Sequence, residues 1–260
     1  MGIIVKNLTF TYGTRPILKD VSFELATNEL VAVLGPNGVG KSTLFKCILG
    51  LLRQYEGEIH INEFNAKKIT EKELSRQIAY IPQSHNPVFN FSVFDMVLMG
   101  TTGQVSSVSS PGPKERQKVM DCLDRLGIQH LYNRSYTFIS GGERQLVLIA
   151  RAMAQNAKIM IMDEPTANLD YGNQIRVLEQ IKSLSKEGYT IILSTHNPDQ
   201  SYLYADRILA IYDGKLIADG NPKDVITTEL IRTLYDVNIT VESLHDDKIR
   251  FCVPDELISK

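Results

Sequence analysis

Apolar and polar residues alternate in short runs at the start of the chain, and further on they give way to longer apolar runs and helical patterns. A period of two is typical of half-buried strands, whereas apolar positions three or four residues apart are typical of amphipathic helices. The first 157 residues therefore predict strands within 3–34, at 57–61 and at 77–83, and helices at 41–52, 93–100 and 115–127.

After residue 157 the pattern becomes a strict alternation of strand and helix. Almost continuously apolar strands are expected at 158–165, 189–196 and 207–214, with a helix at 172–186. Such strands are typical of a parallel sheet covered on both faces. The stretch 213–220 predicts a closing hairpin, and the tail predicts one or two helices and a last strand pair.

The pattern as a whole predicts an α/β fold with a mainly parallel sheet, an N-terminal antiparallel β subdomain and an inserted helical subdomain. We expect one domain over 1–260, with its core at 1–83 and 158–220, the helical part at 84–157 and a tail at 221–260. The Gly-, Ser-, Thr- and Pro-rich stretch 100–113 interrupts the helical part, and its composition is compatible with a flexible loop or with ordered turns.

Composition narrows the function classes. The net charge of −2 offers no electrostatic argument for binding nucleic acid. No run of eighteen apolar residues is present, and the first residues lack the basic and apolar regions of a secretory signal. Three scattered cysteines indicate reduced thiols, and the five histidines lack metal-ligand spacing. We therefore expect a cytosolic protein.

The segment GPNGVGKST follows an apolar strand and opens a helix. It comprises Gly35, Pro36, Asn37, Gly38, Val39, Gly40, Lys41, Ser42 and Thr43. In this strand–loop–helix context the pattern predicts a phosphate-binding loop, whose glycines allow backbone N–H groups to surround phosphate oxygens. Lys41 would reach the β- and γ-phosphates, and the Ser42 hydroxyl would bind Mg²⁺. The core is therefore expected to be a P-loop NTPase.

Polar residues end three further strands. Asp163 and Glu164 close an apolar strand, where two adjacent carboxylates would be costly without a cation. Asp163 fits the Mg²⁺ side, and Glu164 fits a general base that polarises the attacking water. His196 is expected to contact the γ-phosphate, and Gln83 suits Mg²⁺ or the water. For each the alternative is an ordinary solvated or structural strand end.

A second anion-binding pattern follows in FISGGERQLVLIARAM. Ser140 is a good N-cap, and Glu143 completes a capping box. This cap does not require Gly141 and Gly142, because glycine in a helix costs about 0.5–1 kcal/mol relative to alanine. Bare N–H groups at a helix start suit an anion, yet the phosphate loop lies a hundred residues upstream.

These motifs together resemble the ATP-binding subunit of an ABC transporter over nearly the whole chain. The similarity rests on GPNGVGKST, IPQ, ISGGERQLVLIARAMAQ, IMIMDEP, TANLD and STH, in that order. The resemblance implies a head-to-tail homodimer with two ATP molecules at its interface, in which Ser140, Gly141 and Gly142 bind the γ-phosphate held by the other subunit. It also implies that Tyr12 stacks on adenine, although a tyrosine packed on the core is the alternative, and that Asp170 couples the two sites.

Two residues depart from the family pattern, because Ile139 replaces the usual leucine and Glu143 the usual glutamine. The segment after Gln83 and the length look most like ATPases of bacterial metal-chelate importers, which take up siderophore-bound iron, haem, cobalamin or molybdate. Such systems pair two ATPases with two permease subunits and an extracytoplasmic binding protein, which implies a peripheral position on the membrane. An exporter ATPase, an ABC ATPase of translation or DNA maintenance, and a regulator without turnover are the alternatives.

Overall fold

The computed structural model describes residues 2–83, 90–103 and 111–258. The chain divides into two compact units, one formed by residues 1–68 and 185–260 and the other by residues 69–184. Part of the predicted loop 100–113 lies outside the described residues, and so does part of the segment after Gln83. The predicted division into core, helical part and tail stays a prediction, and each unit is described by itself.

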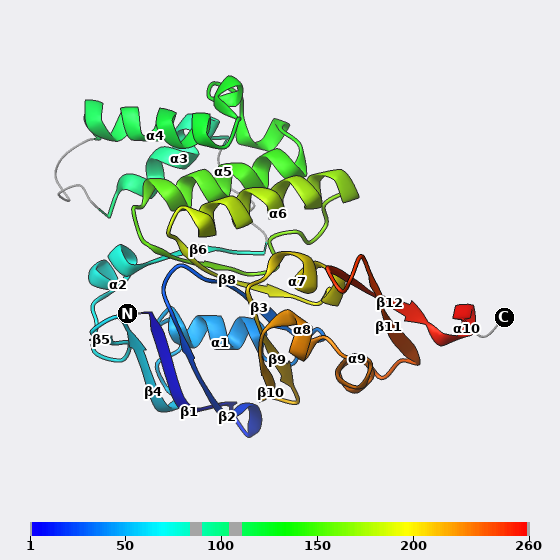
Figure 1. Ribbon diagram of the computed structural model, residues 1–260. Helices are drawn as coiled ribbons and strands as arrows, with labels where there is room; N and C mark the ends of the chain where they lie inside the picture. The colour runs from blue at the N-terminus through cyan, green and yellow to red at the C-terminus, as the bar shows by residue number, and fades with distance from the viewer. Residues whose placement is uncertain (1, 84–89, 104–110, 259–260) are drawn as a thin grey trace. The chain divides into compact units, whose positions relative to one another are not determined.

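The first unit begins with an antiparallel sheet in the order β2-β1-β4-β5 (Figure 1). Its strands are β1 (Ile3–Tyr12), β2 (Arg15–Leu25), β4 (Glu56–Ile61) and β5 (Phe64–Asn65). Ile3 pairs with Leu25 on one side and with Ile61 on the other, and all three side chains are buried. The alternating sequence thus places one apolar face of the sheet in the core.

Three parallel strands form the centre of the same unit. They are β3 (Leu30–Leu34), β8 (Thr190–Thr195) and β9 (Arg207–Tyr212), with β3 in the middle. Every residue of β3 and β8 is buried, as expected for continuous apolar strands of a parallel sheet. The antiparallel β10 (Lys215–Gly220) pairs with β9 through a two-residue turn at Asp213 and Gly214, which confirms the predicted hairpin.

The helix after β3 is shorter than predicted. α1 (Lys41–Ile48) buries Leu44, Phe45 and Ile48, but it does not continue to Leu52. Gly50 takes a left-handed backbone conformation with φ 64°, and its N–H donates to the carbonyl of Cys47. A glycine in this conformation just past the last turn ends a helix.

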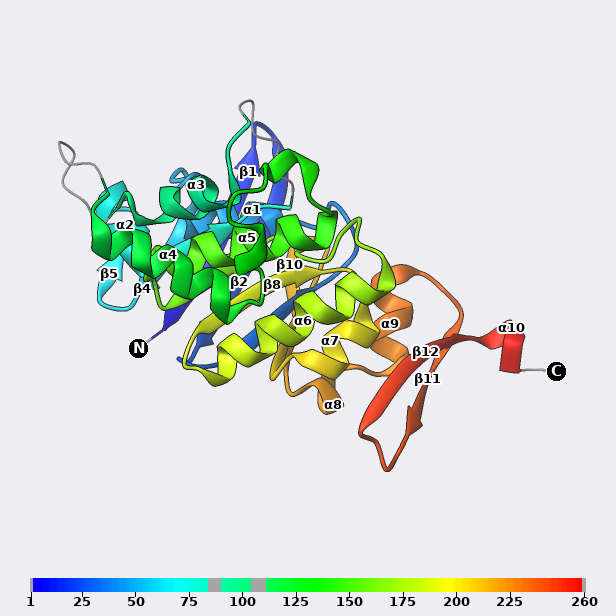
Figure 2. The same ribbon diagram turned by 90° about the horizontal axis from the view of Figure 1, so that it is seen from above.

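The C-terminal part of this unit packs two predicted strands beside short helices (Figure 2). The helices are α7 (Pro198–Tyr204), α8 (Pro222–Val225), α9 (Thr228–Tyr235) and α10 (Asp255–Ile258). The strand pair is β11 (Ile239–Leu244) with β12 (Ile249–Pro254). The carboxylate of Asp199 accepts a hydrogen bond from the N–H of Cys252 at 3.0 Å, which ties α7 to the strand pair.

The second unit is mainly helical. Its elements are α2 (Glu71–Gln77), β6 (Ile78–Ile81), α3 (Val93–Leu98), α4 (Pro113–Arg125), α5 (Gly141–Ala154), β7 (Ile159–Met162) and α6 (Tyr171–Lys186), with single 3₁₀ turns at Met99–Thr101, Gln129–Leu131 and Tyr136–Phe138. Helices α3 and α4 both pack on α5. β6 and β7 are parallel, and Ile78 lies opposite Ile159. α2, with its Thr70 N-cap, was not predicted, and the predicted strand 77–83 spans only Ile78–Ile81.

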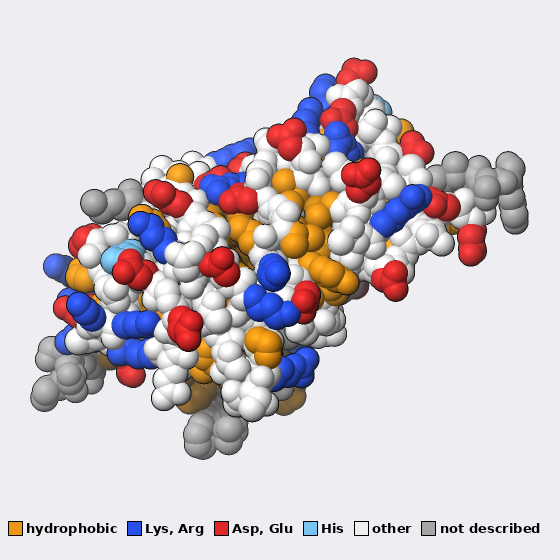
Figure 3. All heavy atoms as spheres, turned by 90° about the horizontal axis from the view of Figure 1, so that it is seen from below, with side chains coloured by type: hydrophobic (Ala, Val, Ile, Leu, Met, Phe, Trp, Pro, Cys, Tyr) orange, Lys and Arg blue, Asp and Glu red, His pale blue; other side chains and the backbone are white. Residues whose placement is uncertain are grey.

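The α/β fold with mainly parallel central strands, an antiparallel N-terminal sheet and a helical part is thereby confirmed. On the face shown in Figure 3, acidic and basic side chains are interspersed, in keeping with the net charge of −2. Within the described residues, no helix is both long and apolar enough to cross a bilayer.

Candidate functional site: a phosphate loop and a signature helix

The phosphate loop connects β3 to α1 in the conformation that its glycines allow. Gly38 and Gly40 have φ values of 84° and 110°, which other residues rarely adopt. A Cβ atom on Gly40 would also lie 2.9 Å from Cδ2 of Leu18. The loop therefore requires glycine at this position both for its backbone angle and for space.

Lys41 is buried at the first turn of α1, and its ammonium group is turned back onto the loop. Nζ donates to the carbonyl oxygens of Gly35 at 2.8 Å and Pro36 at 3.0 Å. A buried cation needs such partners, because an unpaired charge away from water is costly. The loop thus holds a positive charge beside its own N–H groups, and a phosphate would compete with these carbonyls for it.

The neighbouring site residues of the first unit are accessible. Ser42 is exposed next to Lys41, and Thr43 is partly exposed. Tyr12 ends β1 with 47% of its surface exposed, and its ring meets Phe10 edge to face at a centroid distance of 4.8 Å. The ring is thus partly accessible to a stacking partner.

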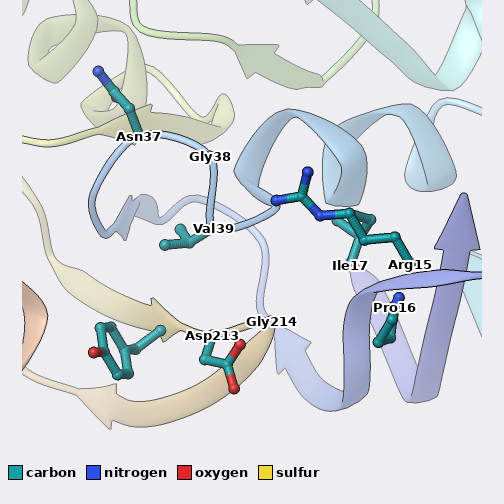
Figure 4. Close-up of a pocket in the computed structure, with 9 residues that line it drawn as sticks. Arg15, Pro16, Ile17, Asn37, Gly38, Val39, Asp213 and Gly214 are labelled. Atoms are coloured by element: carbon teal, nitrogen blue, oxygen red, sulfur yellow. The ribbon is translucent and has the colours of Figure 1, made fainter.

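A cavity of about 380 Å³ borders the loop (Figure 4). Its walls come from the start of β2, from the loop residues Asn37, Gly38 and Val39, and from the β9–β10 turn. Lys19 and Asp213 form a salt bridge of 2.7 Å beside this turn, and the N–H of Lys19 donates to the carbonyl of Gly214. The outer side of the phosphate loop is thus framed by two hairpins.

His196 follows the end of β8, and its side chain is exposed. Its carbonyl oxygen accepts a hydrogen bond of 2.8 Å from the hydroxyl of Tyr235 in α9. The backbone of the preceding Thr195 accepts from the N–H of Gly35, at 3.4 Å. The structure therefore brings the residue before His196 to the first residue of the phosphate loop.

The acidic pair lies at the end of β7 in the second unit. Asp163 is buried, and its N–H donates to the carbonyl of Ile81, which aligns the ends of β6 and β7. Burial, and secondarily the charge of Asp163, raises the pKa of Tyr80 to about 12. The phenol of Tyr80 therefore stays protonated at neutral pH.

Glu164 takes a left-handed backbone conformation with φ 46°. Non-glycine residues in this region store strain and cluster at functional sites. Gln83 donates from Nε2 to Oε2 of Glu164 at 3.2 Å. The structure therefore places these two candidates, 81 positions apart in the sequence, in direct contact.

The start of α5 forms the capping box that the sequence predicts. Glu143 N–H donates to Oγ of Ser140 at 3.3 Å, and Ser140 N–H donates to Oε2 of Glu143 at 2.7 Å. This hydrogen bond from Ser140 lowers the pKa of Glu143 below its ordinary value. Ser140 and Gly141 are exposed, whereas Gly142 is buried. Glu143 therefore has a structural role, and its carboxylate lies beside the helix start.

Asp170 begins α6 in a similar way. Its carboxylate accepts from the backbone N–H of Asn173 at 2.9 Å and from Nδ2 of the same residue at 2.7 Å. These two hydrogen bonds lower the pKa of Asp170. Sequence reasoning missed the contact of Asn173 with Asp170, although an aspartate before a predicted helix is a recognisable N-cap signal.

Comparison with known proteins decides the family. The family model of the ABC transporter matches residues 18–167. The chain is 41% identical, over 90% of its length, to an ABC transporter ATP-binding protein of Haemophilus influenzae, covering 89% of that protein. It belongs to the ABC transporter ATP-binding family. The chain is therefore an ATPase of this family.

Relatives within the ABC family differ in cargo. The molybdate import ATP-binding protein MolC of Haemophilus influenzae is 35% identical, with 90% of this chain and 88% of that protein covered. The hemin import ATP-binding protein HmuV of Bordetella pertussis is 34% identical, with 93% and 94% covered. The ATPase machinery is thus shared by importers of chemically different solutes.

Solved structures give the same family. A metal-chelate type ABC transporter in an inward-facing conformation superposes with a TM-score of 0.87 and 30% identity, over 98% of this chain and 99% of that one. A dimeric ATP-binding cassette in a post-hydrolysis state with ADP and Pi has a TM-score of 0.73 and 26% identity, over 85% and 98%.

The residues predicted to bind Mg²⁺ each carry a hard oxygen atom, the kind of donor that this ion prefers. They are Ser42 in the first unit and, in the second unit, Asp163 and Gln83. The Gln83–Glu164 hydrogen bond uses Nε2, so it leaves the amide oxygen of Gln83 for a cation. Among the described residues no group of three or more His, Cys, Asp or Glu gathers.

Proposed function

We propose that the chain is the ATP-hydrolysing subunit of an importer for a metal chelate or related solute, such as siderophore-bound iron, haem, cobalamin or molybdate. In this proposal two copies act with two permease subunits at the cytoplasmic face of the membrane, and an extracytoplasmic binding protein delivers the solute. The observation that carries it is the likeness to a metal-chelate type transporter over 98% of the chain. The hemin and molybdate importers among the relatives support the same direction of transport.

The first unit supplies ATP binding in this proposal. The N–H groups of Gly35–Thr43 surround the phosphates, and Lys41 exchanges its carbonyl partners for the β- and γ-phosphates. The exposed ring of Tyr12 stacks on adenine, which adds affinity without strict base selection. Accessible Ser42 and buried Asp163, with Gln83, would hold Mg²⁺, which supplies charge neutralisation on the phosphate oxygens.

Hydrolysis depends on Glu164, Gln83 and His196 in this proposal. Glu164 takes a proton from the attacking water as general base, and the strained backbone at this residue supports a functional role. Gln83 is hydrogen-bonded to Glu164, so it can help to orient the same water. His196 donates to the γ-phosphate from its exposed position after β8.

In this proposal α5, called the signature helix because it begins at Ser140–Gly142, binds the ATP that is held by a second copy of the chain. The exposed N–H of Gly141 and the hydroxyl of Ser140 lie at the positive end of α5, where they would bind the γ-phosphate of the other subunit's ATP. Asp170, exposed at the start of α6, would couple the two sites. In a head-to-tail dimer, closure on ATP is then required before hydrolysis.

The test is purification of the tagged chain from its native membranes in a mild detergent, followed by mass spectrometry, with an untagged strain as control. We expect a polytopic permease in stoichiometric amount and an operon-linked binding protein in the same system. A permease whose system has no binding protein would support the rival exporter. Ribosomal or DNA-repair proteins without a membrane partner would overturn the transport assignment.

A further inference from the structure

The loop 166–170 packs directly against the first turn of α5 within the second unit. A Cβ atom on Gly141 would lie 3.2 Å from Cδ2 of Leu169. A Cβ atom on Gly142 would lie only 2.5 Å from both Cγ and Oδ1 of Asn173, a distance that real Cβ atoms do not show. The amide of Asn173 therefore fills the space beside Gly142, and any larger residue there would have to displace it.

Asn173 is held in this place by Asp170. Its Nδ2 donates to Oδ2 of Asp170 at 2.7 Å, and its backbone N–H donates to Oδ1 at 2.9 Å. Gln174 adds a second attachment, because its Nε2 donates to the carbonyl of Leu169 at 3.1 Å. The first turn of α6 is thus hydrogen-bonded to the loop 166–170 through two residues, and the side-chain amide of Asn173 lies beside Gly142.

An ordinary helix cap explains only part of this arrangement. A capping aspartate needs the backbone N–H at the third position, which Asn173 supplies. The second hydrogen bond, from the side chain of Asn173, is not needed to cap α6. It fixes the side-chain rotamer, and it thereby orients the amide toward Gly142 instead of toward solvent.

We infer that Asn173 is a positioning residue, which links Asp170 to Gly142 and so sets the first turn of α5. The inference rests on the proposed function, in which Ser140–Gly142 bind the ATP of the other subunit. A displacement of Asp170 by the partner would move the amide of Asn173, and contact with that amide would move Gly142. Within one subunit, these contacts connect the loop 166–170 directly to the first turn of α5.

The first test is hydrogen exchange in the isolated chain, with wild type compared to Asn173→Ala. We expect faster exchange not only at 171–175, where any weakened cap would show, but also at 140–146. The isosteric Asn173→Asp keeps the shape but loses the donor and places a carboxylate beside Asp170, so we expect the same pattern. Faster exchange confined to 171–175 in both variants would overturn the inference.

The second test is steady-state ATP hydrolysis. Small displacements of a binding group cost as much as about a hundredfold in rate, so kcat should fall about ten- to a hundredfold in both variants. KM for ATP should change less than about twofold, because the ATP-binding groups of the first unit are untouched. Asn221→Ala, which removes the side chain that caps α8, is the matched control and should keep the wild-type kcat.

Parallel measurement of Ser140→Arg separates this inference from the proposed function. If Ser140→Arg is inactive while both Asn173 variants keep the wild-type kcat, the proposed function stands and the positioning role is overturned. If Ser140→Arg keeps full activity, the action of the helix start on a partner's ATP is overturned, and the positioning role falls with it.

Discussion

At the scale of single residues, hydrogen bonds to neutral partners orient two charged side chains of the candidate site. Lys41 donates to two carbonyls of its own loop, and Glu164 accepts from Gln83. Both side chains are thus held in place by neutral groups. Such preorganisation lowers the cost of arranging charged groups when the substrate arrives.

Replacement of Lys41 by alanine should abolish ATP binding. The variant loses the buried positive charge opposite the β- and γ-phosphates, while the loop glycines remain. Binding is measured by titration with a fluorescent ATP analogue. Lys46→Ala, an exposed lysine of the same helix, is the matched control and should bind as wild type does. Undiminished affinity in Lys41→Ala would remove this residue from the site.

Glu164→Gln should bind ATP but hydrolyse it about 10²- to 10⁴-fold more slowly, which is the usual contribution of a general base. The variant should accumulate as an ATP-bound dimer, visible by gel filtration with Mg-ATP. Glu179→Gln, an exposed glutamate of α6, provides the control and should turn over normally. A monomeric Glu164→Gln with wild-type turnover would show that the base lies elsewhere.

At the scale of elements, the capping box of α5 explains the departure at residue 143. A glutamine could accept the same hydrogen bond from Ser140, but it would lack the charge that favours the positive end of the helix. Glu143 therefore stabilises α5, although its charge also lies near the proposed position of a partner's γ-phosphate.

Glu143→Gln should lower the free energy of unfolding at pH 7 by about 0.5 kcal/mol, the size of a helix-dipole interaction at a partly exposed site. The folded-state pKa of Glu143 lies below the ordinary value of 4.5 for a glutamate. Its stabilisation is therefore present above pH 4.5 and is lost as the pH falls through the depressed folded-state pKa.

Urea unfolding of wild type and Glu143→Gln at pH 7 and at several values below pH 4.5 measures this difference. The two curves should converge as the pH falls. A gap that stays constant over the whole range would mean that the charge of Glu143 does not stabilise the helix start.

At the scale of the whole molecule, mixing two inactive variants tests the head-to-tail arrangement, because each ATP site of such a dimer would combine residues of both subunits. Lys41→Ala and Ser140→Arg are each expected to be inactive as homodimers, because each spoils both sites. In a mixed dimer, one site combines the intact phosphate loop of the Ser140→Arg chain with the intact start of α5 from the Lys41→Ala chain.

Equimolar mixing of these two variants should restore about a quarter of the wild-type ATPase rate, since half of randomly paired dimers are mixed and each holds one intact site. The rate is measured by phosphate release after the chains have exchanged. A mixture as inactive as its parents would contradict the head-to-tail arrangement. Lys41→Ala mixed with Glu164→Gln is the control, because the site with an intact loop then lacks its base.

The sequence by itself determined the features that contiguous residues encode. The phosphate loop, the capping box of α5, the apolar central strands and the hairpin at 213–220 depend on local backbone preferences and on hydrophobic period. These signals act over a few residues, so they could be interpreted without knowing what packs on them. The end of α1 was misjudged, because the turn at Gly50 interrupted an apolar pattern that continues past it.

Only the tertiary structure decided which distant residues meet. Gln83 lies 81 positions from Glu164, and the parallel alignment of β6 with β7 brings their ends together. The approach of Asn173 to Gly142 likewise follows from how the first turn of α6 packs against the first turn of α5. Such contacts depend on the packing of whole elements, and a hydrophobic pattern specifies which face is buried but not which atom lies opposite.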